Sequence, residues 1–230
     1  LRLLDEFFEA SERTLIAYSG GKDSRVLTHL LYSRGVRLPG VADVSLNFQA
    51  DADDNRAWAR TMGIPVTEYD RLGGDWIKRN PQFIFASLPV LAKLYQKRQQ
   101  TTIKRHSEAE GYTGVLLGRR AQENHVPRPV YQRANGIWQG NPLAGWKYEH
   151  IWGYLQKHNV PVSPIYYHTV GKIAGASPWP MISQEQVSGW GHNAIDLVQD
   201  YDHAIMDWLA TWWTPAANYR RHGYYEGIFG

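Results

Sequence analysis

The sequence contains no cysteine and no long run of apolar residues. The lack of cysteine excludes disulfide bonds, thiolate zinc sites, iron–sulfur clusters and cysteine nucleophiles among these 230 residues. No apolar run approaches the roughly 18 residues that a membrane-spanning helix requires. The first residues are amphipathic and acidic, unlike the basic flank and apolar stretch of a signal peptide. We therefore expect a cytoplasmic protein without a membrane partner.

Charge and aromatic content narrow the class of partner. The formal net charge of +3 is mild, so it favours anionic ligands without requiring nucleic acid. Ten Trp and fourteen Tyr are present, many of them after Trp138. They can line a ligand groove, stack on bases, or fill a core and a homo-oligomer contact. The last alternative is the favoured one.

The spacing of apolar residues predicts alternating helices and strands. Helices are predicted over residues 2–11, 24–32, 53–62, 89–106, 148–158 and 192–213, and strands over 14–18, 41–48, 66–69 and 114–118. The tail from 218 to 230 shows no periodicity. This alternation is typical of an α/β fold, with a mostly parallel sheet and helices on both faces.

A glycine-rich loop, Ser19-Gly20-Gly21-Lys22-Asp23-Ser24, joins the first predicted strand to the following helix. Glycines allow close approach of the backbone, and a helix N-terminus attracts phosphate. The Walker A pattern is excluded because Asp23 follows Lys22 where Ser or Thr is needed, and G-x-G-x-x-G is absent. The alternative is a glycine turn that caps a helix through Ser19 or Asp23.

This loop resembles the SGGxDS loop of the PP-loop ATP pyrophosphatase superfamily, whose members cleave ATP between its α and β phosphates. The resemblance implies ATP and Mg²⁺ as ligands. It implies that pyrophosphate is held by the N–H groups of Gly20, Gly21 and Lys22 and the hydroxyls of Ser19 and Ser24. Asp23 would orient the loop or help to hold Mg²⁺. Lys22 occupies the variable position and adds positive charge.

Three later segments resemble phosphoadenylyl-sulfate (PAPS) reductases, which share a fold with the small subunit of sulfate adenylyltransferase. They are Asn141–Trp146, Ile151–Leu155 and Asn159–Tyr166. The run Gly118-Arg119-Arg120, with the later Arg128, is similar to that family's Gly-x-Arg-Arg loop. The resemblance implies a nucleotide-binding domain over residues 1–175, followed by a helical extension and aromatic tail over 176–230.

Two departures from that family affect the prediction. The reductases use a catalytic cysteine, so thiol-dependent reduction is not expected of a sequence that has none. The family's Asp-Thr-Gly turn after the second strand is replaced by residues 47–51, Asn-Phe-Gln-Ala-Asp. Asp51, Asp53 and Asp54 are then either carboxylates at the start of a helix or ligands.

The arginines after the fourth predicted strand suggest an anion clamp. Arg119, Arg120 and Arg128 follow a strand's carboxyl end, and guanidinium groups bind phosphate bidentately. If they form this clamp, their loss should barely affect folding, since exposed charges contribute little to stability. The alternative is solvated surface charge. Glu123 and Asn124 are candidates for orienting these arginines. A basic helix end, with Lys97, Arg98 and Lys104 among its residues, is more simply a solvated face than a nucleic-acid contact.

Taken together, these patterns predict an adenylyltransferase that releases pyrophosphate from ATP and acts on an unknown small-molecule acceptor. The predicted catalytic residues are Lys22, Asp23, Arg119 and Arg120; the nucleotide-binding residues are Ser19, Gly20, Gly21, Lys22, Ser24, Gly118 and Arg128; the metal ligand is Asp23. Two alternatives remain. One is a non-catalytic nucleotide-binding or sensor subunit, and the other is an ATP-dependent enzyme that modifies nucleic acid.

Overall fold

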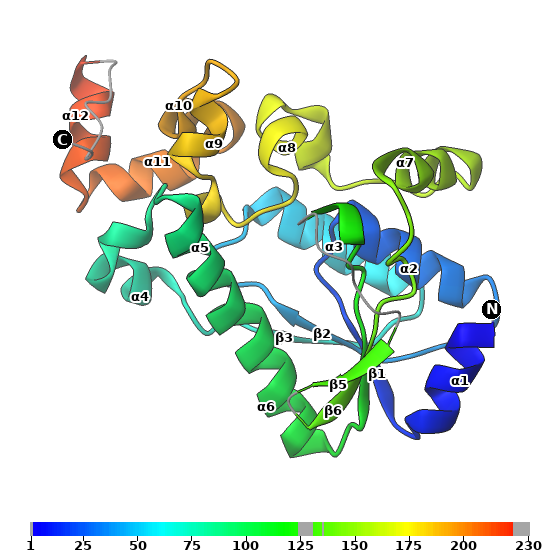
Figure 1. Ribbon diagram of the computed structural model, residues 1–230. Helices are drawn as coiled ribbons and strands as arrows, with labels where there is room; N and C mark the ends of the chain where they lie inside the picture. The colour runs from blue at the N-terminus through cyan, green and yellow to red at the C-terminus, as the bar shows by residue number, and fades with distance from the viewer. Residues whose placement is uncertain (1, 124–130, 135, 223–230) are drawn as a thin grey trace. The chain divides into compact units, whose positions relative to one another are not determined.

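The computed structural model describes residues 2–123, 131–134 and 136–222 (Figure 1). Within them lies a six-stranded sheet of order β3-β2-β1-β4-β6-β5. The strands are β1 (Thr14–Ala17), β2 (Gly40–Asp43), β3 (Val66–Tyr69), β4 (Gly114–Leu116), β5 (Tyr131–Ala134) and β6 (Ile137–Gly140). Neighbouring strands are parallel except β5 and β6, which are antiparallel. The predicted α/β class with a mostly parallel sheet is confirmed.

The chain forms two compact units, each assembled from separate stretches of sequence. Unit 1 comprises residues 1–44, 51–69 and 97–163, and unit 2 comprises residues 45–50, 70–96 and 164–230. The whole sheet belongs to unit 1. The sequence-based boundary between residues 175 and 176 stays a prediction.

Helices cover both faces of the sheet in unit 1. The helices of this part of the chain are α1 (Arg2–Ala10), α2 (Lys22–Tyr32), α3 (Gln49–Thr61), α6 (Thr101–Glu110) and α7 (Tyr148–Lys157). On one face Ile103 of α6 packs with Leu15 and Val115, and on the other Ala59 of α3 packs with Tyr18. Successive side chains of a strand point to opposite faces, so a sheet buried on both sides has apolar residues at consecutive positions.

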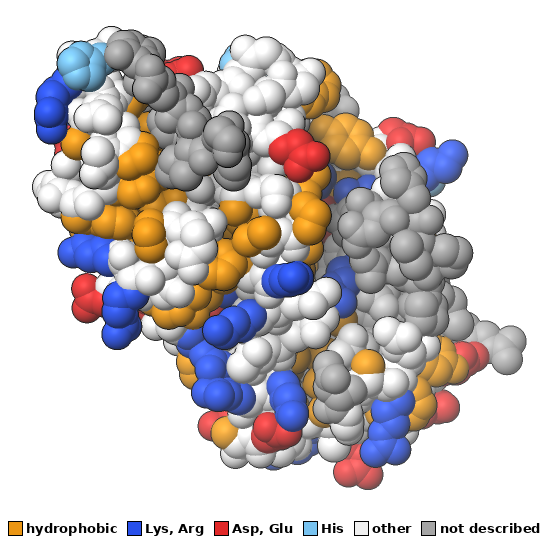
Figure 2. All heavy atoms as spheres, turned by 60° about the vertical axis from the view of Figure 1, so that its left-hand side comes forward, with side chains coloured by type: hydrophobic (Ala, Val, Ile, Leu, Met, Phe, Trp, Pro, Cys, Tyr) orange, Lys and Arg blue, Asp and Glu red, His pale blue; other side chains and the backbone are white. Residues whose placement is uncertain are grey.

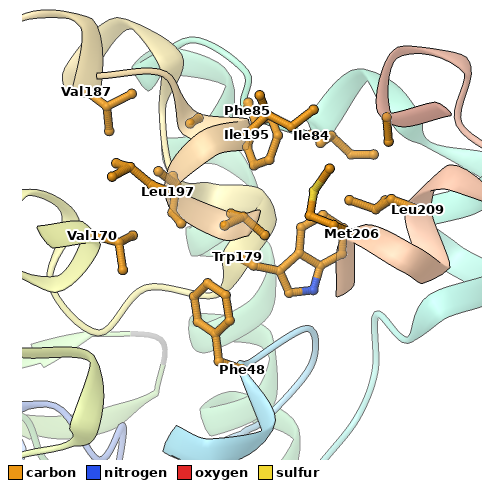
Figure 3. Packing of buried hydrophobic residues seen from close by; sticks show 14 of the residues in the cluster. Phe48, Ile84, Phe85, Val170, Trp179, Val187, Ile195, Leu197, Met206 and Leu209 are labelled. Atoms are coloured by element: carbon orange, nitrogen blue, oxygen red, sulfur yellow. The ribbon is translucent and has the colours of Figure 1, made fainter. Parts of the chain in front are cut away.

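Unit 2 is built from short helices around an aromatic and aliphatic core. Its helices are α4 (Gly74–Arg79), α5 (Leu88–Tyr95), α8 (Thr169–Ala174), α9 (Gln184–Ser188), α10 (Ala194–Tyr201), α11 (His203–Ala210) and α12 (Thr214–His222). Trp179, Phe85 and Met206 lie in this core (Figure 3). Part of the aromatic content thus fills a core, as favoured above. Other aromatic side chains remain outside it, since Tyr167 and Trp190 are 75% and 70% exposed, and Figure 2 shows hydrophobic patches on one face.

Several predicted elements differ from the observed ones for identifiable reasons. The strand expected over 41–48 ends at Asp43, and it could not have continued to residue 48, because Leu46 adopts a positive φ of 60° that extended chain does not have. The terminal helix expected over 192–213 is divided at Asp202, whose side chain accepts the N–H groups of Ala204 and Ile205 and so starts α11. The tail from 218 to 230, where no periodicity was found, begins inside a helix, because α12 extends to His222.

The helix expected over 89–106 continues to Glu110 but is not uniform. A π-helical segment, Gln96–Gln100, separates α5 from α6. Within it Arg98 is buried and lies 3.1 Å from Asp43, and in α6 Lys104 lies 3.6 Å from Glu108. Arg98 and Lys104, two of the basic residues considered for a nucleic-acid contact, are therefore each paired with a carboxylate of the protein.

Candidate functional site

The order of the strands places a topological switch point at β1. This strand pairs with β2 on one side and with β4 on the other. The chain first moves outward through β2 and β3 and then returns to β4. In open parallel sheets the loops on either side of such a point diverge, and ligands bind between them at the carboxyl ends of the strands. The two loops here carry the residues singled out in the sequence.

The loop after β1 requires glycine in its backbone and leads directly into α2. Gly20 has a φ of 73°, and a Cβ at this position would lie 2.0 Å from the side chain of Asn55. Only glycine fits both conditions. Gly21 then serves as N-cap of α2 without a side-chain cap. The first N–H groups of a helix have no partner within it, so this end of α2 is suited to an anion.

The loop after β4 packs against the start of α2. A Cβ on Gly118 would lie 3.0 Å from the carbonyl carbon of Asp23 and 3.1 Å from the nitrogen of Ser24. Arg120, only 4% exposed, donates from Nε to Oδ1 of Asp23 at 2.5 Å. The other oxygen of Asp23 accepts from Nζ of Lys22 at 2.7 Å. One carboxylate therefore holds two cations and joins the two loops.

The same network reaches the start of α7. The side-chain oxygen of Gln122 accepts from Nη1 of Arg120 at 3.2 Å and from the backbone nitrogen of Tyr148 at 2.6 Å. Nζ of Lys22 also lies 5.9 Å from the centre of the Tyr148 ring. The first turn of α7 is consequently positioned beside the glycine loop.

The two adjacent arginines have different partners in the protein, and the anion clamp stays a prediction. Arg119 donates from Nη2 to Oε1 of Gln99 at 3.0 Å and lines a shallow depression with Ile103 and Ile137. Ile103 and Ile137 belong to the core on the α6 face of the sheet. Arg120 is buried and paired with Asp23, so the alternative of a solvated charge and the expectation that folding is indifferent to its loss are both wrong for it. Arg128 and Asn124, also predicted to act here, lie outside the described residues.

The carboxylates at the start of α3 have protein partners. Asp51 is buried and accepts a hydrogen bond from the hydroxyl of Ser163. Asp53 lies 3.0 Å from Arg56, and Asp54 forms an ion pair with Arg25. These contacts are made to side chains of the protein, so whether the three carboxylates also contact a ligand stays a prediction.

Arg25 is a site residue that the sequence reasoning missed. It is fully buried, and its Nε donates to the carbonyl oxygen of Gly20 at 2.9 Å. The sequence carried no clear signal, because in a helix Arg25 shares its face with Thr28 and His29 and lies opposite the apolar stripe. A charged residue is rarely buried unless it is paired.

The fit of Mg²⁺ depends on what the chain offers as ligands. Across residues 2–123, 131–134 and 136–222 there is no group of three or more His, Cys, Asp or Glu side chains able to hold a metal. Both oxygens of Asp23 already contact cations. Mg²⁺ commonly takes one or two carboxylates together with substrate phosphates and water. Asp23 as a metal ligand stays a prediction, and phosphate oxygens would have to supply most of the coordination.

Fold and loops together define an α/β protein with a glycine loop at its switch point. The family model described as phosphoadenosine phosphosulfate reductase domain matches residues 13–178. The chain belongs to this family. The resemblance inferred from the loop and the later segments is confirmed.

Two curated relatives are named adenosine 5'-phosphosulfate reductase. The one from Burkholderia cepacia is 24% identical over 182 residues, covering 71% of this chain and 68% of the relative. The one from Allochromatium vinosum is 27% identical over 86 residues, covering 36% of this chain and 33% of the relative. The matched region thus spans a third of one relative and about two thirds of the other.

Two solved structures share the fold. One is phosphoadenylyl-sulfate (PAPS) reductase from Candida auris in a phosphate complex, with a TM-score of 0.58, 18% identity, and coverage of 72% of this chain and 82% of that one. The other is NMN synthetase from Francisella tularensis, with a TM-score of 0.52, 16% identity, and coverage of 88% and 84%. In the part of the chain that the structure describes, no helix is long and apolar enough to cross a membrane.

Proposed function

We propose that this protein binds an adenine nucleotide at the loop between β1 and α2 and cleaves ATP between its α and β phosphates. The AMP moiety passes to a small-molecule acceptor, and pyrophosphate leaves. The observation that carries this proposal is the pairing of Asp23 with Arg120, which holds the loop after β4 against the glycine loop at the switch point. The pairing fixes the two loops relative to each other before a ligand binds, so that both can contact the same ligand.

The proposed roles follow from the contacts of each residue. The exposed hydroxyl of Ser19 and the N–H groups of Gly21 and Lys22 bind phosphate oxygens, and the ammonium group of Lys22 adds charge. Asp23 and Arg120 position the loops. When bound, Mg²⁺ would neutralise charge on the phosphates. Because the charge that develops in the reaction lies on phosphate oxygens, electrostatics and positioning supply the catalysis, and the acceptor attacks directly.

The absence of cysteine separates this proposal from the activity named for the relatives. A thiol-based reductase needs a sulfur nucleophile, and none of the 230 residues supplies one. Adenylyl transfer needs none, because the acceptor itself is the nucleophile. The loop chemistry and the lack of thiols together favour transfer of AMP over reduction of a sulfonucleotide.

Binding is tested by thermal unfolding with and without MgATP. A ligand present at 100 times its dissociation constant stabilises the folded state by about 2.7 kcal/mol. We expect MgATP to raise the melting temperature and Asp23→Ala to reduce the rise. The matched control is Asp53→Ala, which removes an exposed carboxylate on α3 and should leave the rise unchanged. A melting curve that ATP, PAPS and AMP all leave unmoved contradicts the proposal.

Catalysis is tested by the products. Incubation of the protein with ATP labelled at the α phosphate, in the presence of candidate acceptors, should yield AMP or an adenylate together with pyrophosphate. The bond cleaved decides the outcome. ADP and inorganic phosphate as main products would remove the protein from this chemistry.

A further inference from the structure

The fully buried guanidinium of Arg25 makes contacts to three separate segments of unit 1. Its Nε donates to the oxygen of Gly20 at 2.9 Å, and its Nη1 donates to the oxygen of Pro161 at 3.0 Å. Its Nη2 donates to Oδ1 of Asn55 at 2.7 Å and also pairs with Asp54. The planar fork of arginine, with its five donors, can reach such divergent acceptors, whereas the ammonium of lysine cannot.

These contacts determine how the glycine loop presents its N–H groups. In a planar trans peptide the C=O and the following N–H point in opposite directions. Since Arg25 holds the oxygen of Gly20, the N–H of Gly21 is directed away from Arg25. It points to the hydroxyl of Ser19, an exposed residue, at 3.4 Å.

The next peptide is held by the same residue. The backbone nitrogen of Arg25 donates to the oxygen of Gly21 at 3.0 Å, and the hydroxyl of Ser24 donates to that oxygen at 2.9 Å. The N–H of Lys22 therefore also points out of the start of α2. Arg25 thus acts on two consecutive peptides, once through its side chain and once through its backbone.

We propose that Arg25 is a positioning residue. From the buried side of the glycine loop, it orients the N–H groups of Gly21 and Lys22 toward the anionic ligand. It touches no ligand itself. This inference rests on the proposed function for the identity of the ligand, but the geometry of the loop can be tested without any nucleotide. A merely structural arginine would hold α2 to α3 and leave the order of the loop peptides unchanged.

The test compares Arg25→Lys with Leu31→Ala in the nucleotide-free protein. Leu31 is buried on the same helix, about 9 Å further along it, so its truncation costs stability without contacting the loop. NMR order parameters of the Gly20, Gly21 and Lys22 amides are measured in both variants. In Arg25→Lys we expect them to fall from about 0.85 to below about 0.6. In Leu31→Ala we expect no change.

The affinity for inorganic pyrophosphate and for MgATP provides the second readout. We expect Arg25→Lys to weaken the affinity for both ligands by about tenfold or more, because a misdirected loop N–H loses its hydrogen bond to a charged phosphate oxygen. We expect Leu31→Ala to weaken the affinity for neither. Asn55→Ala, which removes one acceptor of Arg25, serves if Arg25→Lys does not fold, with a smaller change in the same direction. Unchanged order parameters in the Arg25 and Asn55 variants overturn the inference. A wild-type protein that binds neither probe overturns the proposed function instead.

Discussion

Removal of the Arg120 side chain tests whether the two loops are joined by a buried ion pair. Arg120 is 4% exposed and the side chain of Asp23 is 13% exposed, so water screens their attraction little. Breaking a buried pair typically costs about 3–5 kcal/mol, because the remaining charge is left without its partner. Asp23 keeps Lys22 at 2.7 Å, which places the expected cost near the lower limit.

We therefore expect Arg120→Ala to lower the free energy of unfolding by about 3 kcal/mol. For a chain of this size that corresponds to a fall in melting temperature of about 6–12 °C. The measurement is urea-induced unfolding followed by circular dichroism, alongside a thermal scan. Arg119→Ala is the matched control. Its side chain is partly exposed and bonds a neutral amide, so we expect a loss of about 1 kcal/mol or less.

A double-mutant cycle identifies the partner. Asp23→Ala and Arg120→Ala should each destabilise the protein, and the double variant should recover about 1.5–3 kcal/mol relative to the sum of the two. Equal stability of Arg120→Ala and the wild-type protein, or strict additivity of the two changes, would refute the argument that this pair joins the loops.

Two further perturbations follow from the same region. Gly20→Ala should destabilise the protein by more than Gly35→Ala. Both glycines have a positive φ, which costs about 1–2 kcal/mol for alanine, but only at Gly20 would the added methyl group also meet Asn55. Equal losses of unfolding free energy in urea would contradict this steric argument. Burial lowers the pKa of His29 below its ordinary value, and the nearby His158 lowers it further. The unfolded chain then binds more protons than the folded one just below about pH 6.5, so stability should be complete above that pH and fall as the pH drops through this window. His29→Gln should flatten the curve of unfolding free energy against pH, and an unchanged slope would exclude His29 as its source.

The first strand, the glycine loop and the following helix could be predicted from sequence because their causes are local. Buried β-forming residues end at a glycine pair, and apolar residues recur at helical spacing directly afterwards. The strand at 66–69 and the fold class were confirmed for the same reason. The hairpin of β5 and β6 was missed, although the Asn-Gly dipeptide at positions 135–136 is a typical hairpin signal.

The sequence alone thus determined the family and the glycine loop between strand and helix, and it led to the expectation that ligands lie at that end of the sheet. Only the tertiary structure decided which side chains meet there. Arg120 reaches Asp23 across 97 positions of sequence, and Arg25 reaches Pro161 across 136. Arg119, adjacent to Arg120, faces another partner. Periodicity and motifs report the conformation of neighbouring residues, whereas pairings over such separations exist only once the strands have been ordered into a sheet.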